Sequence, residues 1–194
     1  MRQAVQQIPK VYDALVKKSN ERGFSMPSDI HMGALLKTLV ASKPKGNFLE
    51  LGTGMGLSLS WMLDGMCANG TLTTIDNDEE LIQIAKSYFE DDQRLNIICV
   101  DGSQWIKEYD GPTFDLIFAD AWPGKYSELD QLLNLVSVGG FYVIDDMNPQ
   151  ENWPEGHDKN VDQLVSYLDN RIDFNVTKMN WSTGIIIAVK KNSN

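Results

Sequence analysis

The stretch NFLELGTGMGLSLSWML, residues 47–63, decides the fold. Residues 47–51 form a short, mostly apolar run that predicts a β-strand, and residues 57–66 predict a helix. Between them, glycines alternate with other residues at positions 52, 54 and 56. Glycine lets the backbone turn sharply and approach a ligand closely. A strand that passes through such a turn into a helix begins a βαβ unit.

The rest of the chain repeats this alternation of strand and helix. Further strands are expected at residues 71–75, 96–100, 114–119, 141–144, 174–179 and 184–190, and further helices at 10–19, 29–41, 81–88, from 103 onward, at 126–135 and at 161–168. Alternating elements of this kind predict an α/β fold, a doubly wound sheet of parallel strands with helices on both faces. Residues 180–183 are too short for a crossover, so the last two of the seven strands are expected to form an antiparallel hairpin.

Length, charge and cysteine content narrow the class of protein. A chain of 194 residues is expected to fold as a single domain, with residues 1–45 as an N-terminal helical cover and 46–194 as the core. The net charge of −10 repels phosphate backbones, so a nucleic-acid partner is not expected. Polar residues at the N-terminus and short apolar runs predict a cytoplasmic protein without a membrane partner. Cys67 and Cys99 have no metal-ligand spacing.

Acidic residues stand at the ends of the first two strands, where ligands of such sheets bind. The dinucleotide pattern would require glycine at position 57, which is Leu57, and the charge of Glu50 would repel a pyrophosphate. Glu50 therefore favours a ligand with a cationic group. Asp76, at the end of the second strand, is placed to accept both hydroxyls of a ribose.

Three further carboxylates follow two later strands. Asp120 ends the strand at 114–119, while Asp145 and Asp146 end the strand at 141–144. Two like charges about 4 Å apart repel by about 4 kcal/mol at an effective dielectric constant of 20. The cluster therefore predicts a bound divalent cation such as Mg²⁺ or Ca²⁺. The alternative is a set of structural acids that cap helices or pair with Lys125.

These motifs resemble those of the class I S-adenosylmethionine-dependent methyltransferases, over about residues 25–190, and imply their Rossmann-like sheet. The closest resemblance is to the catechol and caffeoyl-CoA type O-methyltransferases. It is carried by LELG through Ser58, by the DGSQ turn at 101–104, by the DAW triplet at 120–122, and by the KY and DD pairs at 125–126 and 145–146. Met26-Pro27 also resembles the segment that covers the cofactor in those enzymes.

The resemblance implies a site for S-adenosylmethionine. In those enzymes the glycine loop cradles the methionine part of the cofactor, the serine at position 58 binds its carboxylate, and the 101–104 turn packs around adenine. The cofactor residues expected on this basis are Glu50, Gly52, Thr53, Gly54, Ser58, Asp76, Asn77, Asp101, Gly102, Ser103 and Asp120. The metal ligands implied are Asp120, Asp145 and Asp146, where the third is an asparagine in the resembled enzymes.

The activity implied is methyl transfer from S-adenosylmethionine to a hydroxyl of a small molecule, with Asp120 and Lys125 as catalytic residues. The lysine that the resembled enzymes use falls at Pro123 here, so Lys125 is expected to replace it as the base, with His157 as the rival. A metal-independent methyltransferase, or a cofactor-binding protein without transferase activity, are the alternatives. The sequence does not identify the acceptor. The apolar face of helix 10–19 suggests a homodimer contact.

Overall fold

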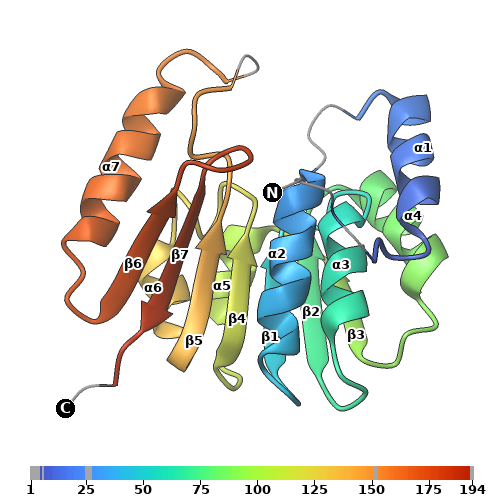
Figure 1. Cartoon of the computed structure of the whole chain (residues 1–194), viewed down its shortest axis with the longest axis horizontal. Helices are drawn as coiled ribbons and strands as arrows, with labels where there is room; N and C mark the ends of the chain where they lie inside the picture. Colours follow the sequence, from blue (N-terminus) through green and yellow to red (C-terminus); the bar gives the residue numbers. More distant parts are fainter. Residues whose placement is uncertain (1–4, 6, 25–27, 151–152, 193–194) are drawn as a thin grey trace.

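The computed structural model of the protein describes residues 5, 7–24, 28–150 and 153–192. Seven strands form one sheet in the order β3-β2-β1-β4-β5-β7-β6 (Figure 1). Their bounds are β1 Asn47–Leu51, β2 Thr71–Asp76, β3 Leu95–Cys99, β4 Phe114–Ala119, β5 Val136–Ile144, β6 Phe174–Met179 and β7 Ile185–Lys190. The pairs among β1 to β5 are parallel, and β7 pairs antiparallel with both β5 and β6. The predicted α/β sheet with its terminal hairpin is confirmed.

Helices cover both faces of the sheet. They are α1 Tyr12–Arg22, α2 Ile30–Ala41, α3 Leu57–Gly65, α4 Glu79–Phe89, α5 Gly102–Glu108, α6 Leu129–Asn134 and α7 His157–Asp169. One apolar core lies between the sheet and α1 to α4, and a second lies between the sheet and α5 to α7. In β4, Leu116 and Phe118 enter the first core while Ile117 and Ala119 enter the second. This two-sided burial explains the continuous apolar sequence of that central strand.

Several predicted boundaries are wrong. Helix α7 begins at His157 rather than at 161, and α1 ends at Arg22 rather than at 19. Strand β5 begins at Val136 rather than at 141, because Gly139 and Gly140 lie within the strand instead of ending the preceding segment. Gly139 has a φ of 74°, and the register of β5 on β4 shifts in this region, as in a β-bulge. Helix α6 begins at Leu129 rather than at 126, since the residues before it form a turn in which Tyr126 N–H donates to the Trp122 carbonyl.

The N-terminal helices pack on the chain's own core. Leu15 of α1 is fully buried there, and Val11 and Val16 are partly buried against the same core. The homodimer contact expected on this helix therefore stays a prediction, with little of its apolar face left uncovered. None of the helices in the described ranges is both long and apolar enough to cross a membrane.

Candidate functional site

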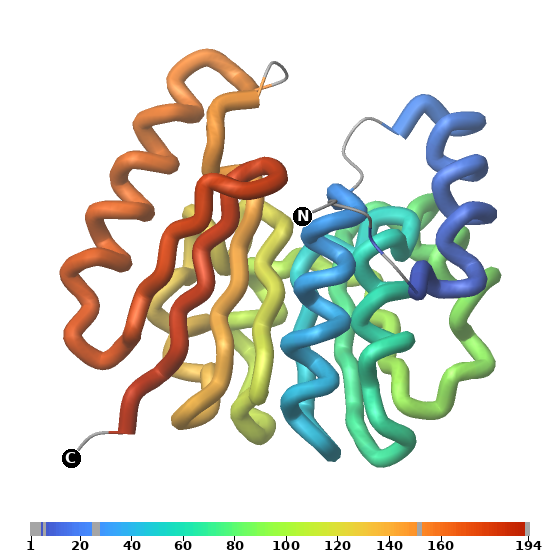
Figure 2. Tube along the Cα trace, in the orientation of Figure 1, coloured from blue at the N-terminus to red at the C-terminus, as the bar shows by residue number. Residues whose placement is uncertain are grey.

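A cavity of about 580 Å³ opens at the carboxyl ends of the parallel strands, where ligands of such sheets bind. Figure 2 shows that the chain rises past the strand ends beyond β5 before it returns as α7. From this segment, Gln150, Trp153, Pro154 and His157 line the cavity. The expected site residues that line the cavity are Gly52, Thr53, Gly54, Ser58, Asp76, Asn77, Asp120, Lys125, Asp145 and Asp146, together with the rival base His157. Within the described ranges, the lining omits Glu50, Asp101, Gly102 and Ser103. Met26 and Pro27 lie outside the described residues.

The glycine loop brings two strand ends close together. Gly52 has a φ of 98°, and a Cβ atom on it would lie 2.6 Å from the backbone carbonyl oxygen of Asp120. Only glycine fits both conditions. The Gly54 N–H donates to Asp76 Oδ2 at 2.8 Å, so the carboxylate that ends β2 also holds the loop that follows β1. Loop and carboxylate are thereby fixed at the same side of the cavity.

Glu50 lies beneath the loop rather than in the cavity. It is fully buried, and its two carboxylate oxygens accept hydrogen bonds from Ser58 Oγ at 2.6 Å and from Thr74 Oγ1 at 2.5 Å. Burial raises the pKa of Glu50 to about 7, although both hydroxyls oppose this shift. In this structure Glu50 joins β1, β2 and the start of α3. Ser58 lines the cavity, but its hydroxyl donates its hydrogen bond to Glu50.

The 101–104 turn contacts the segment that follows β4. Asp101 caps α5 by accepting the Gln104 N–H at 2.9 Å. Ser103 Oγ donates to Glu128 Oε2 at 2.6 Å, and a Cβ atom on Gly102 would lie 3.1 Å from Pro123. These contacts tie α5 to the segment after β4.

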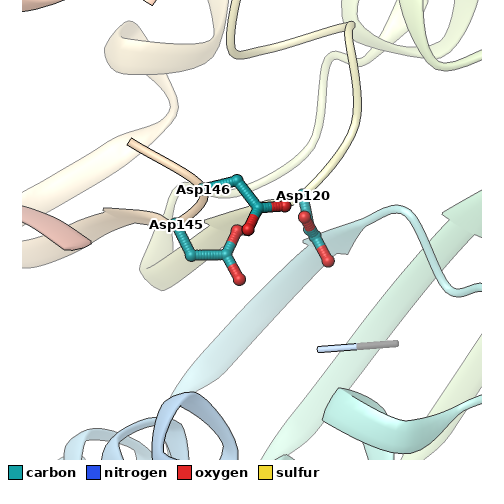
Figure 3. Close-up of side chains that lie close together, drawn as sticks. All are labelled: Asp120, Asp145 and Asp146. Atoms are coloured by element: carbon teal, nitrogen blue, oxygen red, sulfur yellow. The ribbon is translucent and has the colours of Figure 1, made fainter. Parts of the chain in front are cut away.

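The three aspartates converge at the ends of β4 and β5 (Figure 3). One oxygen of each, on Asp120, Asp145 and Asp146, lies within 4.8 Å of the others. Asp145 is 2% exposed, and its Oδ1 has no hydrogen-bond partner in the described part of the chain. A buried carboxylate oxygen without a donor costs free energy unless a cation or a proton meets it. Three clustered carboxylates are also the donor set that a hard divalent cation prefers, so these residues fit such an ion.

Burial and mutual repulsion raise the proton affinity of the cluster. Burial raises the pKa of Asp120 from 3.8 to about 6, against the opposing effect of Lys125. The pKa of Asp145 is raised well above its usual value, first by burial and then by the charge of Asp120. Asp120 Oδ2 also accepts a hydrogen bond from Ser28 Oγ at 3.1 Å. Ser28 lies directly before Asp29, whose side chain caps α2.

Without a bound cation, the protein is expected to lose stability as the pH rises from about 4 to about 6. In this window the folded state retains a proton on Asp120 that the unfolded state has released, so the free energy of unfolding falls with rising pH. Urea unfolding in chelator would measure this slope, and Asp120→Asn is the control because Glu50 contributes in the same direction. The slope should be shallower in Asp120→Asn and in wild-type protein with magnesium. A wild-type slope that matches the variant's would contradict the prediction.

Lys125 reaches the cluster from the turn after β4. Its side chain is buried, and Nζ donates to the backbone carbonyl oxygen of Asp145 at 2.6 Å. Gly124, with a φ of 82°, forms the turn that directs the chain inward. The lysine expected as a base is therefore a hydrogen-bond donor in this structure.

Aromatic side chains surround His157 at the start of α7. The Tyr126 hydroxyl and His157 Nε2 share a hydrogen bond of 3.1 Å, and the ring centroids of Trp153 and Trp122 lie 4.8 and 6.2 Å from the imidazole. Burial, followed by the charges of Asp146 and Asp145, raises the pKa of Tyr126 to about 12, so its hydroxyl keeps its proton. The contact between Tyr126 and His157 is not predicted by the sequence, because the spacing of two distant segments does not indicate whether they meet.

Comparison with protein-family models matches residues 5–186 to the O-methyltransferase family. The chain belongs to this O-methyltransferase family. A relative from Mycobacterium sp. strain KMS that carries an O-methyltransferase name is 34% identical over 140 residues. The aligned part is 68% of this chain and 64% of the relative, so the match spans less than two thirds of that protein. The predicted membership of an O-methyltransferase family is confirmed.

Solved structures share the fold of this O-methyltransferase family member. The O-methyltransferase TomG from Streptomyces achromogenes, in complex with S-adenosylmethionine, superposes with a TM-score of 0.82 at 19% identity, over 94% of this chain and 90% of TomG. A structure from Staphylococcus aureus that carries a caffeoyl-CoA O-methyltransferase name has a TM-score of 0.75 at 19% identity, over 92% of this chain and 91% of that one. At these identities the similarity establishes the common fold.

Proposed function

We propose that this protein transfers a methyl group from S-adenosylmethionine to a hydroxyl of a small molecule, with the help of a divalent cation. The observation that carries the proposal is the convergence of Asp120, Asp145 and Asp146 on the cavity that the glycine loop and Asp76 also line. Family membership and the S-adenosylmethionine held by TomG support the cofactor. The volume of the cavity also falls within the range of roughly 300–1,000 Å³ usual for small-ligand sites.

The first half of the site would bind the cofactor. S-adenosylmethionine supplies a methyl group on a positively charged sulfonium. Gly52 and Gly54 let the backbone approach this ligand without side chains, and Asp76, already oriented by the Gly54 N–H, would accept hydrogen bonds from ribose hydroxyls. Glu50 would support this half of the site by accepting the hydrogen bond that holds Ser58 in place.

The second half would bind the cation and the acceptor. Asp120, Asp145 and Asp146 would hold the ion, and a bound divalent cation would lower the pKa of an acceptor hydroxyl and orient it. The aromatic side chains of Trp122, Tyr126 and Trp153, which line the cavity, would contact the acceptor. Because the Lys125 Nζ is held by its hydrogen bond to the Asp145 carbonyl, we assign the uptake of the acceptor's proton to His157, which lines the same cavity.

One pair of measurements tests this function. Calorimetry with S-adenosylhomocysteine should show binding, and methyl transfer to a panel of phenols should occur with magnesium and fall when a chelator is added. Binding with transfer that ignores the chelator would favour the metal-independent enzyme. Binding without transfer to any phenol or other hydroxyl acceptor would favour a cofactor-binding protein, and absence of binding would contradict the proposal.

Asp76→Ala is expected to weaken S-adenosylhomocysteine binding about tenfold to a hundredfold, because a hydrogen bond to a charged group contributes roughly 1.5–3 kcal/mol. Calorimetry measures the change. The matched control is Asp92→Ala, which removes a carboxylate that also accepts a backbone N–H group, that of Arg94, and that does not line the cavity. Asp92→Ala should lower the melting temperature by loss of its hydrogen bonds with Arg94, with little change in affinity. Equal affinity losses in the two variants would remove the ribose assignment.

A further inference from the structure

Lys125 is a buried cation with a fixed position beside the carboxylate cluster. Its side chain is 5% exposed, and its Nζ lies 2.6 Å from the carbonyl oxygen of Asp145. Its positive charge is near enough to favour the ionised forms of both Asp120 and Asp145. A buried ammonium requires such compensation, because an isolated charge in the protein interior is strongly destabilising.

The peptide between the two aspartates after β5 is held at both of its polar groups. Its carbonyl, on Asp145, accepts the hydrogen bond from Lys125, and its N–H, on Asp146, donates to Thr183 Oγ1 at 3.2 Å. Asp146 has a φ of 54°, in the left-handed region that non-glycine residues rarely adopt. The two hydrogen bonds therefore hold a strained backbone conformation that directs consecutive carboxylates to the same point.

The charges at this point also match a divalent ion. Three ionised carboxylates carry three negative charges, and the Lys125 ammonium leaves a net charge of two negative units. The unpartnered Oδ1 of Asp145 lies in this cluster, as a ligand for an ion would. Without the lysine, a divalent cation would leave one carboxylate charge uncompensated.

We propose that Lys125 is a positioning residue that sets the net charge of this site to match one divalent cation and fixes the peptide that carries Asp145 and Asp146. The inference rests on the metal site of the proposed function. It gives Lys125 a role as a fixed hydrogen-bond donor beside the ligands, and it assigns the selection of ion charge to a residue that is not itself a ligand.

The ratio of affinities for terbium(III) and calcium tests this role, because the two ions both prefer oxygen ligands and differ by one charge. In Lys125→Gln the amide can still donate to the Asp145 carbonyl, but the positive charge is lost. The terbium-to-calcium affinity ratio is therefore expected to rise about tenfold or more relative to wild type, as measured by calorimetry. A loss of packing alone would weaken both ions alike and leave the ratio unchanged.

Lys43→Met is the matched control, since Lys43 Nζ also donates to a backbone carbonyl at 2.6 Å, that of Gly139, away from the cavity. It should leave the ratio unchanged. The double variant Lys125→Gln with Asp146→Asn restores the net charge and should return the ratio toward the wild-type value. If Lys125→Gln does not fold, Asp146→Asn alone serves, and its ratio should fall by a similar factor.

The outcomes separate the inference from the proposed function. An unchanged ratio in Lys125→Gln, with both ions still bound, overturns the role of Lys125 and leaves the metal site intact. Failure of wild-type protein to bind either ion overturns the metal site together with this inference. S-adenosylhomocysteine binding, measured on every variant, reports whether the cofactor half of the site remains folded.

Discussion

His157→Ala is expected to lower the kcat of methyl transfer about 10²- to 10⁴-fold, the usual contribution of a general base. Its affinity for S-adenosylhomocysteine should change little, because the loss is confined to the transition state. The physical reason is that the other candidate, Lys125, already donates from Nζ to the Asp145 carbonyl. Steady-state kinetics with the fastest acceptor of the phenol panel measures the effect.

Chemical rescue identifies which group takes the proton. Added imidazole should restore part of the activity of His157→Ala, since it replaces the lost side chain in the cavity. His31→Ala is the matched control: it removes the other histidine of the chain, which lies on α2 beside Trp181. If Lys125→Ala is rescued by small alkylamines while His157→Ala keeps its activity, the base is the lysine that the sequence predicted.

The strand-end carboxylates could be predicted because they directly follow apolar runs. Asp120 comes after the six-residue strand Phe114–Ala119, and Asp145 comes directly after Ile144, so the sheet alone brings them to one edge. The same rule located Asp76. For these residues, the local pattern and the parallel arrangement together determine the position.

The direction of individual side chains and the contacts between distant segments were not predicted from the sequence. Glu50 shares the face of β1 with Phe48, which packs on the α1 to α4 side, and so it points toward α3 and away from the cavity. The alternation in NFLEL predicts this direction, whereas the charge of Glu50 and the family resemblance both favoured a ligand role. By contrast, the contacts of Ser28 with Asp120 and of Thr183 with Asp146 join segments whose relative positions depend on packing of the whole chain.

Asp145→Asn is expected to abolish most of the stabilisation that magnesium or calcium gives the wild-type protein. An ion that binds only the folded state raises the free energy of unfolding by about 2.7 kcal/mol at a hundred times its dissociation constant. Asp145 is the most buried of the three acids and offers the unpartnered oxygen, so the amide removes both a ligand charge and the strongest repulsion. Thermal melting in chelator and over a titration of each ion measures the effect.

In chelator, the direction in which Asp145→Asn shifts the melting temperature distinguishes a metal ligand from a structural acid. If the ion compensates three repelling carboxylates, Asp145→Asn should melt at the same or a higher temperature than wild type in chelator, because one buried charge is gone. The order should reverse at saturating magnesium. Asp115→Asn, on the same sheet but bonded through Oδ2 to the Asn47 N–H, is the control and should leave the magnesium effect unchanged. If Asp145→Asn melts lower in chelator and magnesium shifts neither protein, Asp145 has a structural role and the methyl transfer proceeds without a metal.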